Sequence, residues 1–201
     1  AGGGGGGGSG GRDAEEVHLV TGTLPDALGG AVEVTDGSQV GAATAATLDR
    51  YGQIDILINN AGIVRDAQLV KVVDGEVVDL MSEEDFDAVI AVNVKGVFLC
   101  TQSVVPHMVE RGYGRIVSAS SVVGLYGNFG QTNYVAAKTG VIGMTKAWAH
   151  ERGKHGITAT ALAPGFIETG MALAVPEKVL AHMVERTPVR RLGRPEEVAA
   201  A

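Results

Sequence analysis

The chain has very few of the residues on which several protein classes depend. One cysteine, Cys100, occurs among 201 residues, which excludes an intrachain disulfide and a cysteine-based metal site. It lies in an apolar run, so we expect it to be buried as a small apolar side chain. Aromatic residues make up 4% of the chain although hydrophobic residues make up 45%. The core must therefore consist of Ala, Val, Ile and Leu, which suits helices packed on a parallel sheet.

Basic blocks and long apolar segments are also missing. The formal net charge is −7, from 16 Lys and Arg against 23 Asp and Glu, which argues against binding to nucleic acid or to an anionic membrane. Because no uninterrupted run of roughly 18 apolar residues occurs, we expect no membrane span. The start of the chain has no basic region followed by an apolar one, so we expect no signal peptide. These features predict a cytoplasmic protein.

Glycine is concentrated at the start of the chain. Residues 1–11 are almost all glycine, and such a segment cannot offset its ordering entropy by burial, so we expect it to be disordered. A loop that binds an anion is the functional alternative, but no strand precedes the glycines. Residues 12–201 are long enough for one domain with a sizeable core.

Apolar runs that fit strands alternate with amphipathic segments that fit helices. We expect strands at 16–21, 32–34, 54–58, 115–119 and 157–162, and helices at 38–51, 82–110 and 132–152, near 176 and from Pro195. Asp74-Gly75, between two valine-rich runs, predicts a surface hairpin. Strands that alternate with helices predict right-handed crossovers and a doubly wound parallel α/β sheet, with helices on both faces.

Tyr134 and Lys138 are the most informative pair in the chain. Residues at i and i+4 share one face of a helix, so the Lys138 ammonium can lie near the Tyr134 hydroxyl. A nearby cation favours phenolate and lowers the pKa of a tyrosine from about 10. The tyrosine can then give and take a proton near neutral pH. On its own the spacing is a weak indication, because chance supplies it often.

Other motifs in a fixed order surround this pair. They are Asn59-Asn60-Ala61-Gly62 after an apolar run, Asn93 within 91–96, Ser121 at the end of 114–121, and Pro164-Gly165 after 157–163. Together with Tyr134 and Lys138 they resemble the short-chain dehydrogenase/reductase family, most closely its bacterial 3-oxoacyl-(acyl carrier protein) reductases. The resemblance extends from about residue 31 to residue 198 and implies a Rossmann-like fold.

The resemblance implies catalytic roles for four residues. Tyr134 would be the general acid and base, and Lys138 would lower its pKa and bind the nicotinamide ribose. Ser121 would hydrogen-bond the substrate oxygen and stabilise charge that develops there. Asn93 would hold a water that links Lys138 to solvent. The structural alternatives are a surface Tyr and Lys, a capping serine and a solvent-facing asparagine.

The resemblance also implies NAD or NADP as cofactor and no metal. Asn60, Ala61 and Gly62 follow a strand end, where small side chains would let the adenosine ribose approach the backbone. Glu33 and Val34 fall where the family has an acid and a valine beside the adenine. The motif after the last of the expected strands would also contact the cofactor, through Pro164, Gly165, Ile167 and Thr169. Of these, Ile167 and Thr169 would contact the nicotinamide carboxamide.

The N-terminal part departs from the family pattern. Leu19-Val20-Thr21-Gly22 resembles its first strand and first phosphate-loop glycine, but Asp26 and Leu28 stand where two further glycines are needed. The residue that selects NAD or NADP has no counterpart. We therefore expect the phosphate-binding unit and the last strand to be missing, with weak dinucleotide binding and weak or absent activity as the result.

The resemblance implies reduction of a 3-oxoacyl thioester or a related ketone, as in fatty acid biosynthesis. Residues 171–190 would form an apolar lid over the substrate, although packing on the core is an equal alternative. One functional alternative is a non-catalytic partner subunit that keeps the two long helices, which in the family pair across a dimer interface. Another is an epimerase or dehydratase of the same fold. A homo-oligomer, either dimer or tetramer, is expected.

Overall fold

The computed structural model describes residues 32–170 and 177–201. Its centre is a parallel three-stranded sheet in the order β1-β4-β5, formed by Ile56–Asn59, Gly114–Ala119 and Ile157–Leu162. Ile58 pairs with Val117 across β1 and β4, and Val117 pairs with Thr160 across β4 and β5. Each connection between neighbouring strands contains a helix, which confirms the α/β class with a parallel sheet expected from the sequence.

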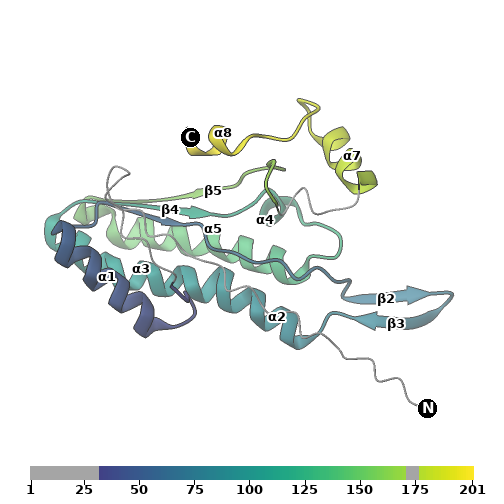
Figure 1. Ribbon diagram of the computed structural model, residues 1–201, viewed down its shortest axis with the longest axis horizontal. Coiled ribbons are helices and arrows are strands. Elements are labelled where there is room, and N and C mark those ends of the chain that lie inside the picture. Colours follow the sequence, from purple (N-terminus) through teal and green to yellow (C-terminus); the bar gives the residue numbers. More distant parts are fainter. Residues whose placement is uncertain (1–31, 171–176) are drawn as a thin grey trace, which may run out of the picture.

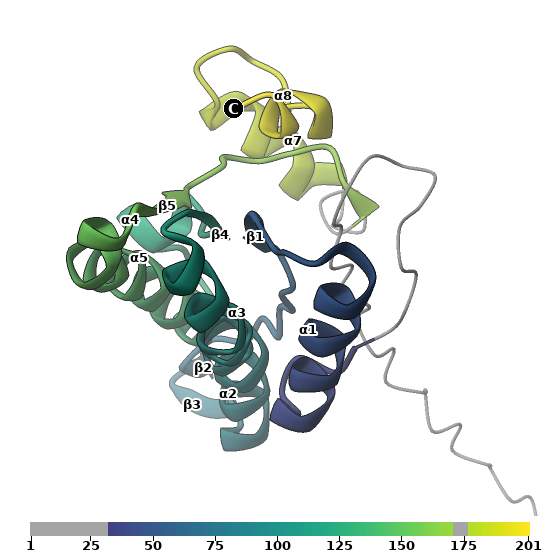
Figure 2. The ribbon, with the colours of Figure 1, turned by 90° about the vertical axis from the view of Figure 1, so that its left-hand side faces the viewer.

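Three long helical segments cover one face of this sheet (Figures 1 and 2). They are α1 (Gly37–Tyr51), the continuous segment of α2 (Glu83–Ile90), the π-helix η1 (Ala91–Gly96) and α3 (Val97–Arg111), and α5 (Thr132–Arg152). Shorter elements are α4 (Val123–Tyr126), η2 (Gly153–His155), α7 (Glu177–Arg186) and α8 (Pro195–Ala199). The core lies between these helices and the sheet and is aliphatic, as the composition predicts, with Val104, Met108 and Ile116 fully buried.

Helix ends follow the expected capping chemistry. Asp36 accepts hydrogen bonds from the amides of Ser38 and Gln39 at the start of α1, and these bonds lower the pKa of its carboxyl. Ser82 accepts from the amide of Asp85 at the start of α2. Gly52 and Gly112 end α1 and α3 with φ of 74° and 68°, in the left-handed region that glycine enters without strain.

Two expectations about the sheet differ from the structure. Residues 32–34 form no strand, because Val34 enters a turn that the Asp36 amide closes on the Glu33 carbonyl. On the second face of the sheet, among the described residues, no helix packs against β1, and Ile56 and Ile58 are 51% and 57% exposed. The strand predicted at 16–21, the glycine-rich start and residues 171–176 of the expected lid lie outside the described residues.

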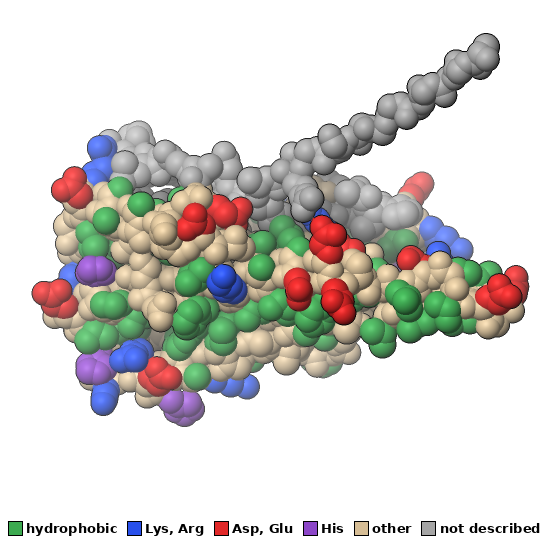
Figure 3. All heavy atoms as spheres, turned by 90° about the horizontal axis from the view of Figure 1, so that it is seen from below, with side chains coloured by type: hydrophobic (Ala, Val, Ile, Leu, Met, Phe, Trp, Pro, Cys, Tyr) green, Lys and Arg blue, Asp and Glu red, His purple; other side chains and the backbone are tan. Residues whose placement is uncertain are grey.

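The hairpin predicted around Asp74-Gly75 is present. Strands β2 (Val70–Val73) and β3 (Glu76–Leu80) pair antiparallel, with Asp74 and Gly75 at φ of 51° and 86° in the turn. The hairpin projects from the body of the molecule beyond α2 (Figure 1) and all of its residues are exposed. In Figure 3 it is the arm at the right, and hydrophobic side chains follow its length.

Within residues 32–170 and 177–201, one helix is long and apolar enough to cross a membrane. It is the continuous segment Glu83–Arg111, with a mean hydropathy of 1.6 over its most apolar window. Its side chains Val97, Val104 and Met108 are buried against the rest of the described chain. A core helix of this kind meets the same criteria of length and composition, so the result is weak evidence for a membrane.

Candidate active site

The candidate site lies where the three parallel strands end. Strands β1, β4 and β5 end at Asn59, Ala119 and Leu162, at the same edge of the sheet. The residues that follow these ends carry the motifs singled out in the sequence. In open α/β sheets ligands bind in the crevice outside the carboxyl ends of the strands, so the topology alone brings the motifs together.

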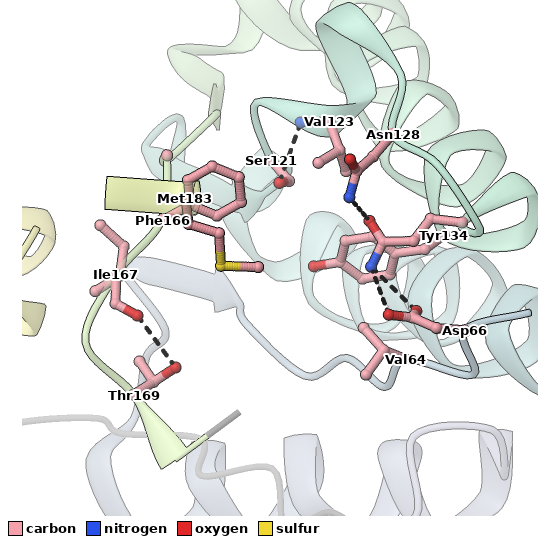
Figure 4. A pocket seen from close by; sticks show the side chains of 12 residues that line it. Val64, Asp66, Ser121, Val123, Asn128, Tyr134, Phe166, Ile167, Thr169 and Met183 are labelled. Carbon is pink, nitrogen blue, oxygen red and sulfur yellow. Dashed lines mark hydrogen bonds between the residues drawn. The ribbon is translucent and has the colours of Figure 1, made fainter. Parts of the chain in front are cut away.

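A cavity of about 220 Å³ opens at this edge. Segments far apart in the sequence line it: the loop after β1, the segment after β4, the first turn of α5, the segment after β5, and α7. The lining residues are Val64, Asp66, Ser121, Val123, Asn128, Gln131, Tyr134, Gly165, Phe166, Ile167, Thr169 and Met183. In Figure 4 the Tyr134 hydroxyl points into the cavity toward Met183.

Tyr134 and Lys138 lie one turn apart on α5, as their spacing predicts. The Lys138 Nζ atom is 5.4 Å from the centroid of the Tyr134 ring. Lys138 is 4% exposed, and its Nζ donates a hydrogen bond of 2.8 Å to the carbonyl of Ala119 at the end of β4. Burial removes water from the ammonium and strengthens its electrostatic effect on nearby groups. The geometry places a desolvated cation beside a phenol that faces a cavity.

Ser121 lines the same cavity as Tyr134, just after β4. Its Oγ accepts a hydrogen bond of 3.3 Å from the amide of Val123, at the start of α4. This contact is the capping role that was the structural alternative for Ser121, yet the residue also lines the cavity. The neighbouring Ser120 is buried, and its hydroxyl donates to the Lys138 carbonyl at 2.8 Å. Ser121 can therefore both hold the turn that leads into α4 and present its hydroxyl proton to a ligand.

Asn93 is fully buried within the π-helix η1 and does not face solvent. Its Nδ2 donates to the carbonyl of Ile63, and its Oδ1 accepts from the amide of Ile63, each at 2.8 Å. The side chain therefore holds the loop after β1 by both of its polar atoms. The water relay expected of Asn93 stays a prediction.

Close packing joins these residues. A Cβ atom on Gly62 would lie 2.8 Å from Asn93 Oδ1 and 3.4 Å from Lys138 Nζ. A Cβ atom on Gly124 would lie 2.9 Å from the carbonyl carbon of Lys138. The distances of 2.8 Å and 2.9 Å are shorter than Cβ atoms ordinarily show. Glycine at 62 therefore lets the loop approach Asn93 in η1, and glycine at 124 lets α4 approach the backbone of α5 at Lys138.

The expected cofactor residues divide into two groups. Gly165, Ile167 and Thr169 line the cavity beside Tyr134, and the carbonyl of Pro164 accepts from the amide of Val122 next to it. The members of the other group are not among the lining residues: Asn60, Ala61, Gly62, Glu33 and Val34.

Val34 and Glu33 differ in their surroundings. Val34 is 3% exposed and packs against Gly96 in the core, so its side chain is closed to a ligand and only its backbone could meet one. Glu33 is exposed, and its Oε1 accepts from the Thr35 hydroxyl at 2.8 Å. The assignment of both residues to an adenine site remains a prediction.

Several lining residues were not singled out as site residues in the sequence. Asp66, Gln131 and Asn128 form a hydrogen-bonded chain along one wall, in which Gln131 Nε2 donates to both Asp66 oxygens at 3.0 Å. Phe166 and Met183 form an apolar wall on the other side (Figure 4). Met183 lies on α7, within the expected lid. No local spacing predicts that these residues line one cavity, because they come from the loop after β1, the segment leading into α5, the segment after β5 and α7.

The residues present fit the nicotinamide end of a dinucleotide. A Cβ atom on Gly165 would meet no atom within 4 Å, so the backbone at the cavity wall is open to a flat ring. The hydroxyls of Tyr134 and Ser121 line the same cavity, and the buried Lys138 ammonium lies beside the Tyr134 ring. The segment that was expected to lack the phosphate-binding glycines, with Asp26 and Leu28, lies outside the described residues. Among those that are described, no cluster of three or more His, Cys, Asp or Glu could hold a metal ion.

Comparisons with known proteins agree with this geometry. A family model described as short chain dehydrogenase matches residues 11–179. The 3-oxoacyl-(acyl-carrier-protein) reductase FabG of Thermotoga maritima is 53% identical over 168 residues, which cover 84% of this chain and 65% of that protein. Nodulation protein G of Azospirillum brasilense is 45% identical, with 84% of this chain and 65% of that protein covered.

A third relative is named for a different substrate. The (2S)-[(R)-hydroxy(phenyl)methyl]succinyl-CoA dehydrogenase subunit BbsD of Thauera aromatica is 44% identical over 172 residues, which cover 86% of this chain and 65% of that protein. The chain thus spans less than two thirds of the length of these relatives. The family model nevertheless covers most of its residues. The chain belongs to the short-chain dehydrogenase family.

Proposed function

We propose that the protein is an NAD(P)-dependent oxidoreductase that moves a hydride between nicotinamide and a carbonyl or alcohol carbon. The observation that carries the proposal is one cavity lined by the hydroxyls of Tyr134 and Ser121, with the buried Lys138 ammonium beside the tyrosine ring. Family membership and the relatives named as reductases and dehydrogenases support the same reaction class.

Tyr134 is the proposed general acid in the reductive direction. A dinucleotide held beside Gly165, Ile167 and Thr169 would supply the hydride. The phenol of Tyr134 gives its proton to the carbonyl oxygen. The Lys138 ammonium stabilises the resulting phenolate by its charge. Ser121 donates a hydrogen bond to the same oxygen as negative charge develops on it. A positioned general acid contributes about 10²- to 10⁴-fold to a rate.

The substrate we propose is a 3-oxoacyl thioester or a related ketone. Phe166, Ile167 and Met183 give the cavity an apolar wall suited to an acyl chain, opposite the polar wall of Asp66, Gln131 and Asn128. The Thermotoga maritima relative is named for a 3-oxoacyl substrate on acyl carrier protein. We extend the proposal to a cytoplasmic homo-oligomer acting in fatty acid biosynthesis, on the same likeness.

The test is a reductase assay on the purified chain. Acetoacetyl thioester and either NADH or NADPH are mixed with the protein, and loss of the dihydronicotinamide absorbance is followed. Tyr134→Phe removes the proton donor and should lower kcat by about 100-fold or more. Tyr126→Phe is the matched control, because Tyr126 is 83% exposed on α4, outside the cavity lining, and its loss should leave kcat unchanged.

Each remaining outcome counts against the proposal. Reductase activity that survives Tyr134→Phe undiminished contradicts the assigned mechanism. No dinucleotide binding up to millimolar concentration, by nicotinamide fluorescence, favours a non-catalytic partner subunit. Conversion of an alcohol or epimer without net change in the cofactor absorbance favours an epimerase or dehydratase of the same fold.

A further inference from the structure

Asn133 directly precedes the proposed catalytic tyrosine and is fully buried. Nothing in the proposed chemistry uses its side chain. A buried side-chain amide that loses its hydrogen-bond partners costs free energy, so such groups are almost always paired. The partners of Asn133 therefore show which parts of the molecule it holds in place.

The oxygen of Asn133 serves the start of α5. The first backbone amides of a helix have no partner within the helix, and the residue before the helix commonly supplies one. Here the preceding residue, Gln131, makes no such side-chain bond. Instead the Asn133 Oδ1 atom accepts the amide of Tyr134 at 2.7 Å, from within the first turn. The backbone of Tyr134 is thus fixed by its own neighbour.

The nitrogen of Asn133 binds two other elements. Its Nδ2 donates to the carbonyl of Arg65 at 2.8 Å, in the loop after β1, and to the carbonyl of Asp85 at 3.3 Å, in α2. One side chain therefore joins the start of α5 to the loop and to α2. These partners lie 68 and 48 residues away in the sequence.

The same loop is held from its other side by Asn93. That side chain pairs with both backbone groups of Ile63, two residues before Arg65. Residues 63–65 therefore lie between two fully buried carboxamides, one from η1 and one from α5. The adjacent Val64 and Asp66 line the cavity together with Tyr134. Both carboxamides therefore hold the stretch of loop that borders the cavity near Tyr134.

We propose that Asn133 is a positioning residue, which sets Tyr134 relative to the loop after β1 that lines the same cavity. The role rests on the proposed reductase function. Asn133 itself makes no contact with the reacting atoms. Its loss should leave binding of the ketone and dinucleotide nearly intact and reduce the rate of proton transfer, because a small misplacement of a reacting group is costly.

Two variants test the role. Asn133→Ala removes all three hydrogen bonds, and Asn133→Asp keeps the oxygen that accepts from Tyr134 but replaces the nitrogen that donates to Arg65 and Asp85. In both, kcat should fall by about 10- to 100-fold, whereas KM for ketone and for dinucleotide should change by less than about 3-fold. Thr145→Val is the control, since it deletes a buried hydrogen bond on the same helix, from Thr145 Oγ1 to the Val141 carbonyl.

A double-mutant cycle separates positioning from general stability. If Asn133 acts through Tyr134, adding Asn133→Ala to Tyr134→Phe should lower the residual rate no further. An equal fall in that background overturns the proposal, as does a kcat within about 2-fold of the unaltered protein. Unfolding of both variants where Thr145→Val stays folded also overturns it, because Asn133 would then serve global stability.

A second measurement does not need activity. Hydrogen exchange at the amides of residues 63–66 and 132–135 should be faster in Asn133→Ala than in Thr145→Val. Unchanged exchange there overturns the positioning role. If the unaltered chain reduces no ketone, the proposed function fails, and the exchange result still decides whether Asn133 fixes the start of α5 to the loop.

Discussion

Gly62 occupies a point where the backbone passes within contact distance of two polar groups of the candidate site. Gly62→Ala would bring a methyl group to 2.8 Å from Asn93 Oδ1 and 3.4 Å from Lys138 Nζ. We expect kcat to fall and the free energy of unfolding to drop by about 1–3 kcal/mol, because the loop must move to relieve the clash. Ketone reduction and thermal unfolding measure the two effects.

Gly41 provides the opposite control. It lies inside α1, and a Cβ atom there would meet nothing within 4 Å. Gly41→Ala should raise the free energy of unfolding by about 0.5–1 kcal/mol, because alanine loses less backbone entropy in a helix. Equal effects of the two substitutions would show that crowding at Gly62 has no consequence.

Individual residues differ in how far the sequence predicts them. Tyr134 and Lys138 could be placed together from their spacing, because both lie on one helix. The burial of Val34 could not be predicted from the sequence, because it depends on packing against Gly96, far along the chain. Nor could the role of Asn133, whose partners are contributed by a loop and a second helix. Local spacing predicts contacts within one helix or strand, but it does not predict contacts between different elements.

At the scale of elements, Glu197 ties α8 to the segment before it. Its carboxylate accepts two hydrogen bonds of 2.7 Å from the Arg191 guanidinium and one of 2.7 Å from the Arg194 amide. The Arg191 bond is the main cause that lowers the pKa of Glu197 from 4.5 to about 2. A lowered pKa means that the contact stabilises the folded segment above about pH 4.5 and is lost as the pH falls toward 2.

A carboxyl titration by NMR checks this expectation. The Glu197 midpoint should lie near pH 2, and Arg191→Met should move it back toward 4.5. Glu196, the adjacent carboxylate on the same helix, is the internal comparison. A Glu197 midpoint near 4.5 in the unaltered protein would show that the ion pair is not maintained in solution. Because both side chains are partly exposed, added salt should weaken the effect.

The elements themselves were largely predictable. Strand β5 and helix α5 have the bounds expected from their apolar pattern, and the Asp74-Gly75 turn was enough to predict the hairpin. The π-helix η1 was not predicted, because the sequence there continues an ordinary helical pattern. In the structure, η1 contains Asn93, whose side chain binds Ile63. A tertiary contact accompanies this irregularity, and no local propensity indicates it.

At the scale of the whole molecule, Cys100 reports on the integrity of the core. It is 6% exposed within the hydrophobic core, and burial raises the pKa of its thiol from 9.0 to about 11. The folded state therefore holds the neutral thiol where the unfolded state would ionise. This contribution to stability is complete below about pH 9 and is lost as the pH rises toward 11.

Thiol labelling and alkaline unfolding test this behaviour. At pH 8 a thiol reagent should react with Cys100 only at the rate at which the core opens. The free energy of unfolding should decline above about pH 9, and Cys100→Ala should remove that part of the decline. Immediate reaction of the native protein would place the thiol at the surface, contrary to the structure.

The projecting hairpin is a place where extra residues can be inserted into the chain. Its tip, Asp74-Gly75, is exposed and already uses left-handed backbone, and neither residue contributes to the cavity. Extra residues at such a tip cost little beyond the entropy of closing a longer loop. A fluorescent label or an affinity peptide could be inserted between Asp74 and Gly75 while the cavity lining stays as it is, which gives the chain a point of attachment away from its chemistry.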